Sequence, residues 1–148
     1  MLCWLFYDNG TGPIFGFGNP WDDTSSSSAN RGVALEINET EITVFFKYQG
    51  NSHTRHLSHP IKLSGRGWKF VGASYDHHSS KAKLWVDGDD VETKDLRERH
   101  KLATKGTVIM GKSLEIKITQ MHVYNLALTQ EQIQTIQKRT KIPGLNKT

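Results

Sequence analysis

The chain has 148 residues, with 19 Lys and Arg against 15 Asp and Glu, which gives a net charge of +4. This length suffices for a hydrophobic core, and we expect residues 1–148 to form one domain. The mild positive charge permits binding to acidic polymers. We do not expect nucleic-acid binding, because the sequence has no segment that combines aromatic and basic residues. None of its apolar runs is as long as a membrane span.

The first predicted strand covers residues 2–7, an apolar run that starts directly after Met1. This start lacks the basic region, longer apolar stretch and small-residue cleavage site of a signal peptide. Cys3 is the only cysteine, so no disulfide can close within the chain. We favour a buried, apolar Cys3 over the alternative, which is pairing with a cysteine outside this sequence.

Short apolar runs broken by turn residues predict further strands, several with the alternation of a half-buried sheet. Residues 20–32 form a long polar loop between them. A two-residue hairpin turn is favoured at Asp87-Gly88, because glycine tolerates the positive φ that such a turn needs. The predicted strands cover residues 14–17, 33–37, 41–48, 68–75, 81–86, 91–94, 107–111 and 116–124, with shorter ones near 55–57 and 61–63.

One helix is predicted near the C-terminus. Thr129 is a good N-cap, and Gln132 stands three residues later, as a capping box requires. Leu128 and Ile133 are placed to form a hydrophobic staple across the cap. Pro143 and the glycine after it stop the helix. Many short strands with one terminal helix indicate an all-β sandwich.

Several of these residues together resemble a known family. Trp68 opens a strand that ends in Tyr75-Asp76, and a second strand leads into Asp87-Gly88. Residues 123–133 then read Val-Tyr-Asn-Leu-Ala-Leu-Thr-Gln-Glu-Gln-Ile. This series resembles laminin G-like domains of the concanavalin A-like lectin and glucanase superfamily. The resemblance implies an all-β, concanavalin A-like jelly-roll β-sandwich with a short C-terminal helix, here lacking its first strand or strands.

The resemblance also implies a function. Such domains act mainly as non-catalytic recognition modules for a carbohydrate or an extracellular protein, within a larger adhesion or receptor ectodomain. We therefore expect an extracellular location and no enzymatic activity. A glycoside hydrolase-related sandwich and a purely structural module are the alternatives. The hydrolase would need two carboxylates across a sugar cleft, whereas Asp87, Asp89 and Asp90 cluster at a hairpin tip, where turn formation explains them.

Three groups of residues are candidate sites. Family members often hold calcium in a loop, and Asp22 and Asp23 are the candidates here, with carboxylate oxygens as the ligands that calcium needs. The densest basic segment would bind a sulfated glycan through Arg97, Arg99, Lys101 and Lys105. The pattern for N-glycosylation occurs at Asn9, Asn38 and Asn146, which supports an extracellular origin.

Two further patterns have simpler interpretations. His53, His56 and His59 match a zinc-ligand count, but in a strand a spacing of three residues alternates faces, so we expect solvated histidines. Residues 76–80 (Asp-His-His-Ser-Ser) hold the residue types of a hydrolytic triad. A triad depends on spatial roles rather than on adjacency, so we interpret the segment as a polar loop between two strands.

Overall fold

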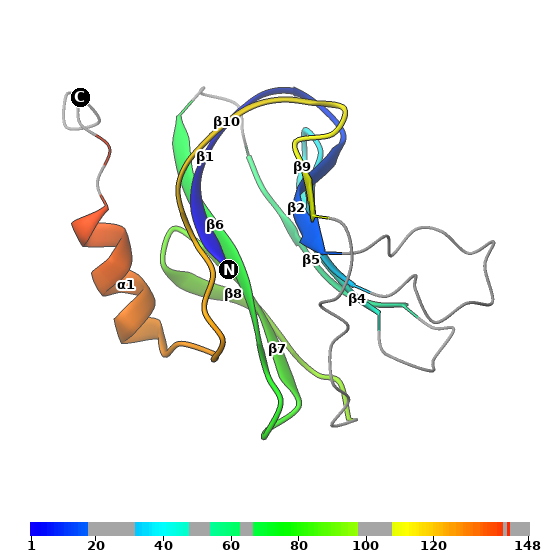
Figure 1. Cartoon of the computed structure of the whole chain (residues 1–148), viewed down its shortest axis with the longest axis vertical. Coiled ribbons are helices and arrows are strands. Elements are labelled where there is room, and N and C mark those ends of the chain that lie inside the picture. Colours follow the sequence, from blue (N-terminus) through cyan, green and yellow to red (C-terminus); the bar gives the residue numbers. More distant parts are fainter. Residues whose placement is uncertain (18–31, 48–53, 63–66, 98–107, 141, 143–148) are drawn as a thin grey trace.

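The computed structural model describes residues 1–17, 32–47, 54–62, 67–97, 108–140 and 142. Within these ranges, ten strands form two five-stranded antiparallel sheets that pack face to face, with a helix against the outside of one of them (Figure 1). The predicted all-β jelly-roll sandwich with a short C-terminal helix is confirmed.

The first sheet has the strand order β10-β1-β6-β7-β8, and the second has the order β5-β4-β3-β2-β9. The strands of the first sheet are β1 (Leu2–Gly10), β6 (Trp68–Asp76), β7 (Lys81–Val86), β8 (Asp89–Asp95) and β10 (Leu114–His122). Those of the second are β2 (Gly12–Phe17), β3 (Val33–Ile37), β4 (Glu41–Lys47), β5 (Thr54–Pro60) and β9 (Val108–Met110). Strand β5 contains the short strand expected near residues 55–57, whereas Ile61 and Lys62, from the one expected near 61–63, follow its end.

The main core fills the space between the two sheets. Alternate residues of each strand point inward, because successive side chains of a strand face opposite ways. Cys3, Leu5 and Tyr7 enter from β1, and Val44 and Phe46 enter from β4. All five side chains are buried, so alternate residues of β1 and β4 face the core.

A second apolar cluster lies on the outer face of the first sheet, beneath helix α1 (Gln130–Arg139). Trp4, Phe70 and Trp85 pack there against Ile133 of the helix. The Trp4 indole N–H also donates to Thr140 Oγ1 at 2.9 Å, which joins the sheet to the end of the helix. Trp85 alternates along β7 with the core residue Leu84 and so shares its face with Lys81 and Lys83, yet it is 1% exposed, because the helix covers that face.

Helix α1 begins as the sequence predicts. The Thr129 hydroxyl accepts from the Gln132 backbone N–H, and the Gln132 side chain accepts from the Thr129 N–H at 2.9 Å. This reciprocal pair satisfies two N–H groups that a helix start would otherwise leave unpaired. Leu128 and Ile133 join the same apolar cluster, as the predicted staple requires. No helix in the described ranges is long and apolar enough to cross a membrane.

The hairpin between β7 and β8 also has the predicted form. Asp87 has a φ of 52° and Gly88 a φ of 86°, the two positive values of a type I′ turn. Asp87 adds a contact that the turn signal did not predict: its Oδ1 accepts from the Phe70 N–H at 3.1 Å, and its Oδ2 accepts from Lys69 Nζ at 3.0 Å. The turn is thereby tied to the neighbouring strand β6.

Candidate functional site: a pocket at one end of the sandwich

A pocket of about 440 Å³ opens at one end of the sandwich, and we call it the end pocket. It lies where β1 begins and where β2, β4 and β6 end. The second sheet contributes Phe15, Phe17, Val33 and Phe46, the first contributes Met1 and residues 73–75, and His77 and residues 123–126 complete the lining. The volume falls in the range of small-molecule sites, about 300–1,000 Å³.

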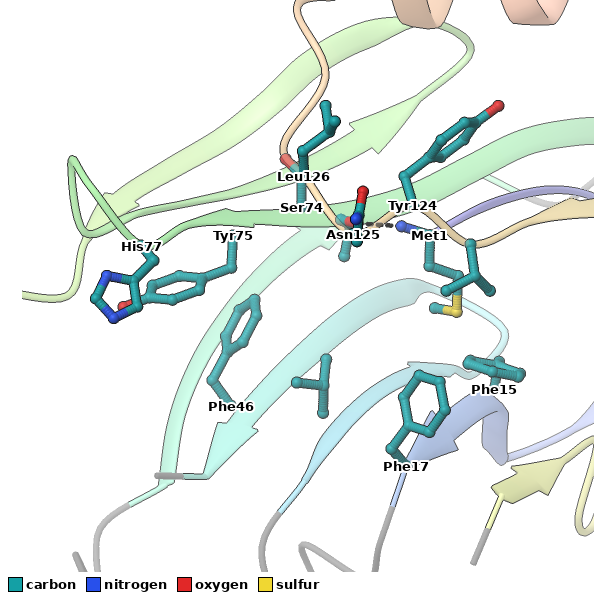
Figure 2. A pocket seen from close by; sticks show the side chains of 13 residues that line it. Met1, Phe15, Phe17, Phe46, Ser74, Tyr75, His77, Tyr124, Asn125 and Leu126 are labelled. Atoms are coloured by element: carbon teal, nitrogen blue, oxygen red, sulfur yellow. Dashed lines mark hydrogen bonds between the residues drawn. The ribbon is translucent and has the colours of Figure 1, made fainter. Parts of the chain in front are cut away.

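Aromatic rings form much of the wall. The rings of Phe15 and Phe17 meet edge to face with centroids 5.0 Å apart, and those of Phe46 and Tyr75 lie 6.0 Å apart across the two sheets. Figure 2 shows the three phenylalanines projecting from the second sheet toward Met1 and Tyr75 of the first. The interior of the pocket therefore suits an apolar surface of a ligand.

Tyr75 brings a polar group into this apolar wall. Its side chain is half-buried, and burial raises the pKa of its phenol above the ordinary value of 10, with the adjacent Asp76 charge raising it further. The phenol is therefore protonated at neutral pH. A protonated phenol can both donate and accept a hydrogen bond, so Tyr75 can orient a neutral polar ligand.

The rim combines polar and apolar side chains. His77 and Asn125 are exposed there and offer donors and acceptors. Val123 and Leu126 are 56% and 59% exposed, so apolar surface continues outward from the pocket. None of the described residues that line the pocket is acidic. The lining thus offers hydrogen bonds and apolar contact, but not the paired carboxylates of a glycosidase.

Of the four residues of the predicted basic site, the structure describes only Arg97. Arg97 is exposed just after β8, and its backbone N–H donates to Asp95 Oδ1 at 2.8 Å. It does not line the end pocket. The other three residues of that site, Arg99, Lys101 and Lys105, lie outside the described residues, so sulfated-glycan binding through this segment stays a prediction.

The candidate metal ligands are also described only in part. Asp22, Asp23 and His53 lie outside the described residues. His56 stands opposite Phe45, and His59 opposite the buried Ile42, so these two histidines face opposite sides of β5, as their spacing predicts. Within the described ranges, no group of three or more His, Cys, Asp or Glu is placed to hold a metal ion.

The triad-like segment closes the turn between β6 and β7. Asp76 Oδ1 accepts from the His78 N–H at 3.0 Å, and Asp76 Oδ2 accepts from Ser79 Oγ at 2.5 Å. These bonds lower the pKa of Asp76, the Ser79 hydroxyl having the largest effect. The carboxylate is therefore a turn-forming group, which agrees with the interpretation as a polar loop.

Most of the chain matches a known protein family. Residues 4–134 match a laminin G-type family model described as the concanavalin A-like lectin/glucanases superfamily. The chain belongs to this superfamily. The resemblance carried by Trp68, Tyr75 and the Asp87-Gly88 turn is thereby confirmed. Comparison with curated protein sequences gave no match.

Several solved structures share the superfamily fold seen here. The CBM40 domain of the Ruminococcus gnavus IT-sialidase is similar with a TM-score of 0.67 at 14% identity, over 91% of this chain and 79% of that one. The binding domain of botulinum neurotoxin serotype D/C gives a TM-score of 0.69 at 13% identity, over 93% of this chain and 35% of that one. A SAP-like pentraxin from Limulus polyphemus gives a TM-score of 0.64 at 18% identity, over 91% of this chain and 67% of that one. At these identities the likeness shows the fold.

The end pocket was not predicted from the sequence. The sequence predicts the strands that carry Phe46 and Tyr75, but it does not predict an opening between them. One signal does exist in the sequence: Leu126 is apolar and lies beyond the predicted strand 116–124. Apolar residues past a strand end can mark a surface that the sandwich leaves open.

Proposed function

We propose that this chain is a non-catalytic module that binds a carbohydrate in the end pocket. The observation that carries the proposal is the pocket's lining, in which aromatic walls meet a rim with polar side chains and no acidic residue among those described. A sugar ring presents a C–H face and an edge of hydroxyl groups. Sites for small molecules commonly pair an apolar wall with a few polar groups in this way.

Each part of the pocket has a distinct task in this proposal. The half-buried Phe17 ring packs against the C–H face of the sugar, where aromatic side chains contribute large contact areas. The Tyr75 phenol, the Asn125 amide and His77 exchange hydrogen bonds with hydroxyl groups at the rim. Because none of the described lining residues is a carboxylate, we expect the bound sugar to be held and not hydrolysed.

The superfamily relatives support a carbohydrate partner. The same CBM40 domain has been solved with α2,3-sialyllactose and with α2,6-sialyllactose bound. The fold accordingly accommodates a bound glycan in at least that domain. A fold alone does not determine a function, so the proposal rests on the lining of the end pocket.

A glycan array tests the proposal, followed by titration of the best-bound glycan. We expect Tyr75→Phe, which removes only the hydroxyl, to weaken binding about fivefold, since one hydrogen bond contributes on the order of 1 kcal/mol. Tyr75→Ala also removes ring contact and should weaken binding further. Retention of full affinity by Tyr75→Ala would place the ligand elsewhere, and an array without any bound glycan would contradict the function.

The turn after β6 offers a matched control. His77 lines the pocket, whereas His78 is its exposed neighbour and does not. His77→Ala should weaken glycan binding, and His78→Ala should leave it unchanged, because the hydrogen bond of His78 to Asp76 comes from its backbone N–H. Equal effects of the two substitutions would show that the turn, and not the pocket, is responsible.

A protein partner is the second candidate function. Val108 and Met110 of β9 are 51% and 52% exposed and pair with Phe17 and Phe15, two wall residues of the end pocket. With Val123 and Leu126, they extend apolar surface around the pocket. Exposed apolar surface of this kind is typical of protein interfaces. Met110→Ser should then weaken the protein complex and leave glycan affinity unchanged, since Met110 does not line the pocket.

A further inference from the structure

Two of the three glycosylation patterns meet at one end of the sandwich. Residues 9–11 (Asn-Gly-Thr) cover the end of β1 and the turn into β2, and residues 38–40 (Asn-Glu-Thr) connect β3 to β4. Together these six residues line a shallow polar hollow of about 380 Å³. The third pattern, at Asn146, lies outside the described residues. We call this end of the molecule the sequon end.

We propose that Asn9 and Asn38 carry N-linked glycans side by side at the sequon end. Each pattern has threonine at its third position, and neither has proline between, as the acceptor pattern requires. Asn9, Thr11 and Thr40 are exposed, and Asn38 is half-buried. A glycan on either asparagine can extend into solvent without displacing the core.

The hydrogen bonds of both asparagines are compatible with attachment. Asn38 Oδ1 accepts from the Thr40 N–H at 2.9 Å, from Thr40 Oγ1 at 3.2 Å and from the Glu41 N–H at 2.9 Å. Asn9 Oδ1 accepts from the Gly10 N–H at 2.8 Å. The N–H donors require a carbonyl oxygen as their acceptor, which fixes the orientation of each side-chain amide. The turns therefore use the oxygen, while a glycan bonds to the nitrogen.

The transfer chemistry keeps every one of these bonds. The side-chain Nδ2 forms a bond to C1 of the first sugar of a lipid-diphosphate-linked oligosaccharide. The bond from C1 to the diphosphate oxygen breaks, the lipid diphosphate leaves with the electron pair, and Nδ2 loses one proton. The product is still an amide with an intact carbonyl oxygen. Asn9 and Asn38 can therefore hold their turns after modification as they do before it.

The sequon end is opposite to the end pocket. Strand β1 starts at the pocket beside Met1 and reaches Asn9 near its other end; its nine residues span about 30 Å at roughly 3.4 Å per residue. Strand β4 likewise runs from the turn after Asn38 to Phe46 in the pocket wall. Attached glycans would consequently leave the pocket open to its own ligand, so this inference is independent of the proposed function.

The test is secretion of the full chain from a eukaryotic host behind a cleavable signal sequence, with Asn146→Gln present throughout. Peptide N-glycosidase should then shift the protein by two glycan steps on a gel, and mass spectrometry should find aspartate at positions 9 and 38 after release. Asn9→Asp and Asn38→Asp should each remove one step, and the double variant should remove both. Unmodified asparagine at either position in the secreted protein would overturn the proposal.

Two controls separate loss of the glycan from loss of the fold. Aspartate keeps the side-chain oxygen that accepts the turn hydrogen bonds, so Asn38→Asp should melt close to the parent when both are made without glycans. Thr40→Ser keeps both the acceptor pattern and the hydroxyl and should retain the gel shift, whereas Thr40→Val should lose the step at Asn38. If Thr40→Val kept that step, the glycan would lie elsewhere.

Discussion

Cys3 lies in the core between the two sheets. It is 0% exposed, and burial raises the pKa of its thiol to about 12. The thiolate, which is the reactive form, is therefore nearly absent at neutral pH. Burial and the raised pKa both favour the sequence interpretation of Cys3 as a small apolar residue over pairing with an outside cysteine.

This chemistry gives a direct prediction for thiol reagents. The native protein should react with an aromatic disulfide reagent at pH 8 only as fast as it unfolds, and denaturant should release one thiol at once. A colorimetric thiol assay in both conditions measures this difference. Rapid modification of the native protein, or a mixed disulfide on the purified chain, would show an accessible Cys3 instead.

Asp76 makes stability depend on pH in a defined direction. Hydrogen bonds from Ser79 and His78 lower its pKa below the ordinary value of 3.8 in the folded state. The folded protein then binds its proton less readily than the unfolded chain, so the contribution of Asp76 is complete above the ordinary pKa and is lost as the pH falls through the folded pKa.

Asp76→Asn isolates that contribution. The variant should be less stable than the parent at pH 7. The difference should shrink as the pH falls below about 4, because the Asp76 carboxyl of the parent becomes protonated and, like asparagine, neutral. Urea unfolding across this pH range measures it. A difference that stayed constant with pH would assign the effect to turn geometry and not to the charge of Asp76.

At the level of elements, helix α1 depends on its first turn. Replacing Thr129 by alanine removes the acceptor for the Gln132 N–H and should lower the free energy of unfolding by about 1 kcal/mol. Thr129→Ser keeps the hydroxyl and should stay close to the parent. The comparison is made by urea unfolding, and equal stability of all three proteins would show that the capping box contributes nothing measurable.

The elements with local signals were the ones that the sequence predicted well. The Asp87-Gly88 turn and the Thr129 cap depend on residues next to them in the chain, so their chemistry can be read without the fold. Trp85 differs, because its burial requires Ile133 to lie over it from almost fifty residues away. Alternation along β7 contains no information about a helix that docks on the far side of the sheet.

The same reasoning explains why the end pocket was not predicted. Phe15, Phe46 and Tyr75 come from three strands in two sheets, and each has the pattern of an ordinary core residue. Only the packing of the two sheets shows that the core opens at this end. A sequence pattern assigns the face of a strand correctly, yet it does not show where the neighbouring sheet stops covering that face.

On the scale of the whole molecule, the chain offers two different kinds of surface for a glycan. The end pocket has aromatic walls and neutral or weakly basic polar groups, whereas the predicted basic segment begins with the exposed Arg97. A neutral sugar bound in the pocket is held by contact and hydrogen bonds. A sulfated polymer on the basic segment would be held by charge.

Salt distinguishes the two sites. Raising it from about 0.1 M to about 1 M shortens the Debye length from about 10 Å to about 3 Å, which screens exposed charges. Binding of a neutral glycan should hardly change over this range, and Tyr75→Ala should abolish it. Binding of a sulfated polymer should weaken with salt and with Arg97→Ala plus Arg99→Ala, while Tyr75→Ala leaves it intact. A neutral glycan released by salt would contradict the pocket as its site.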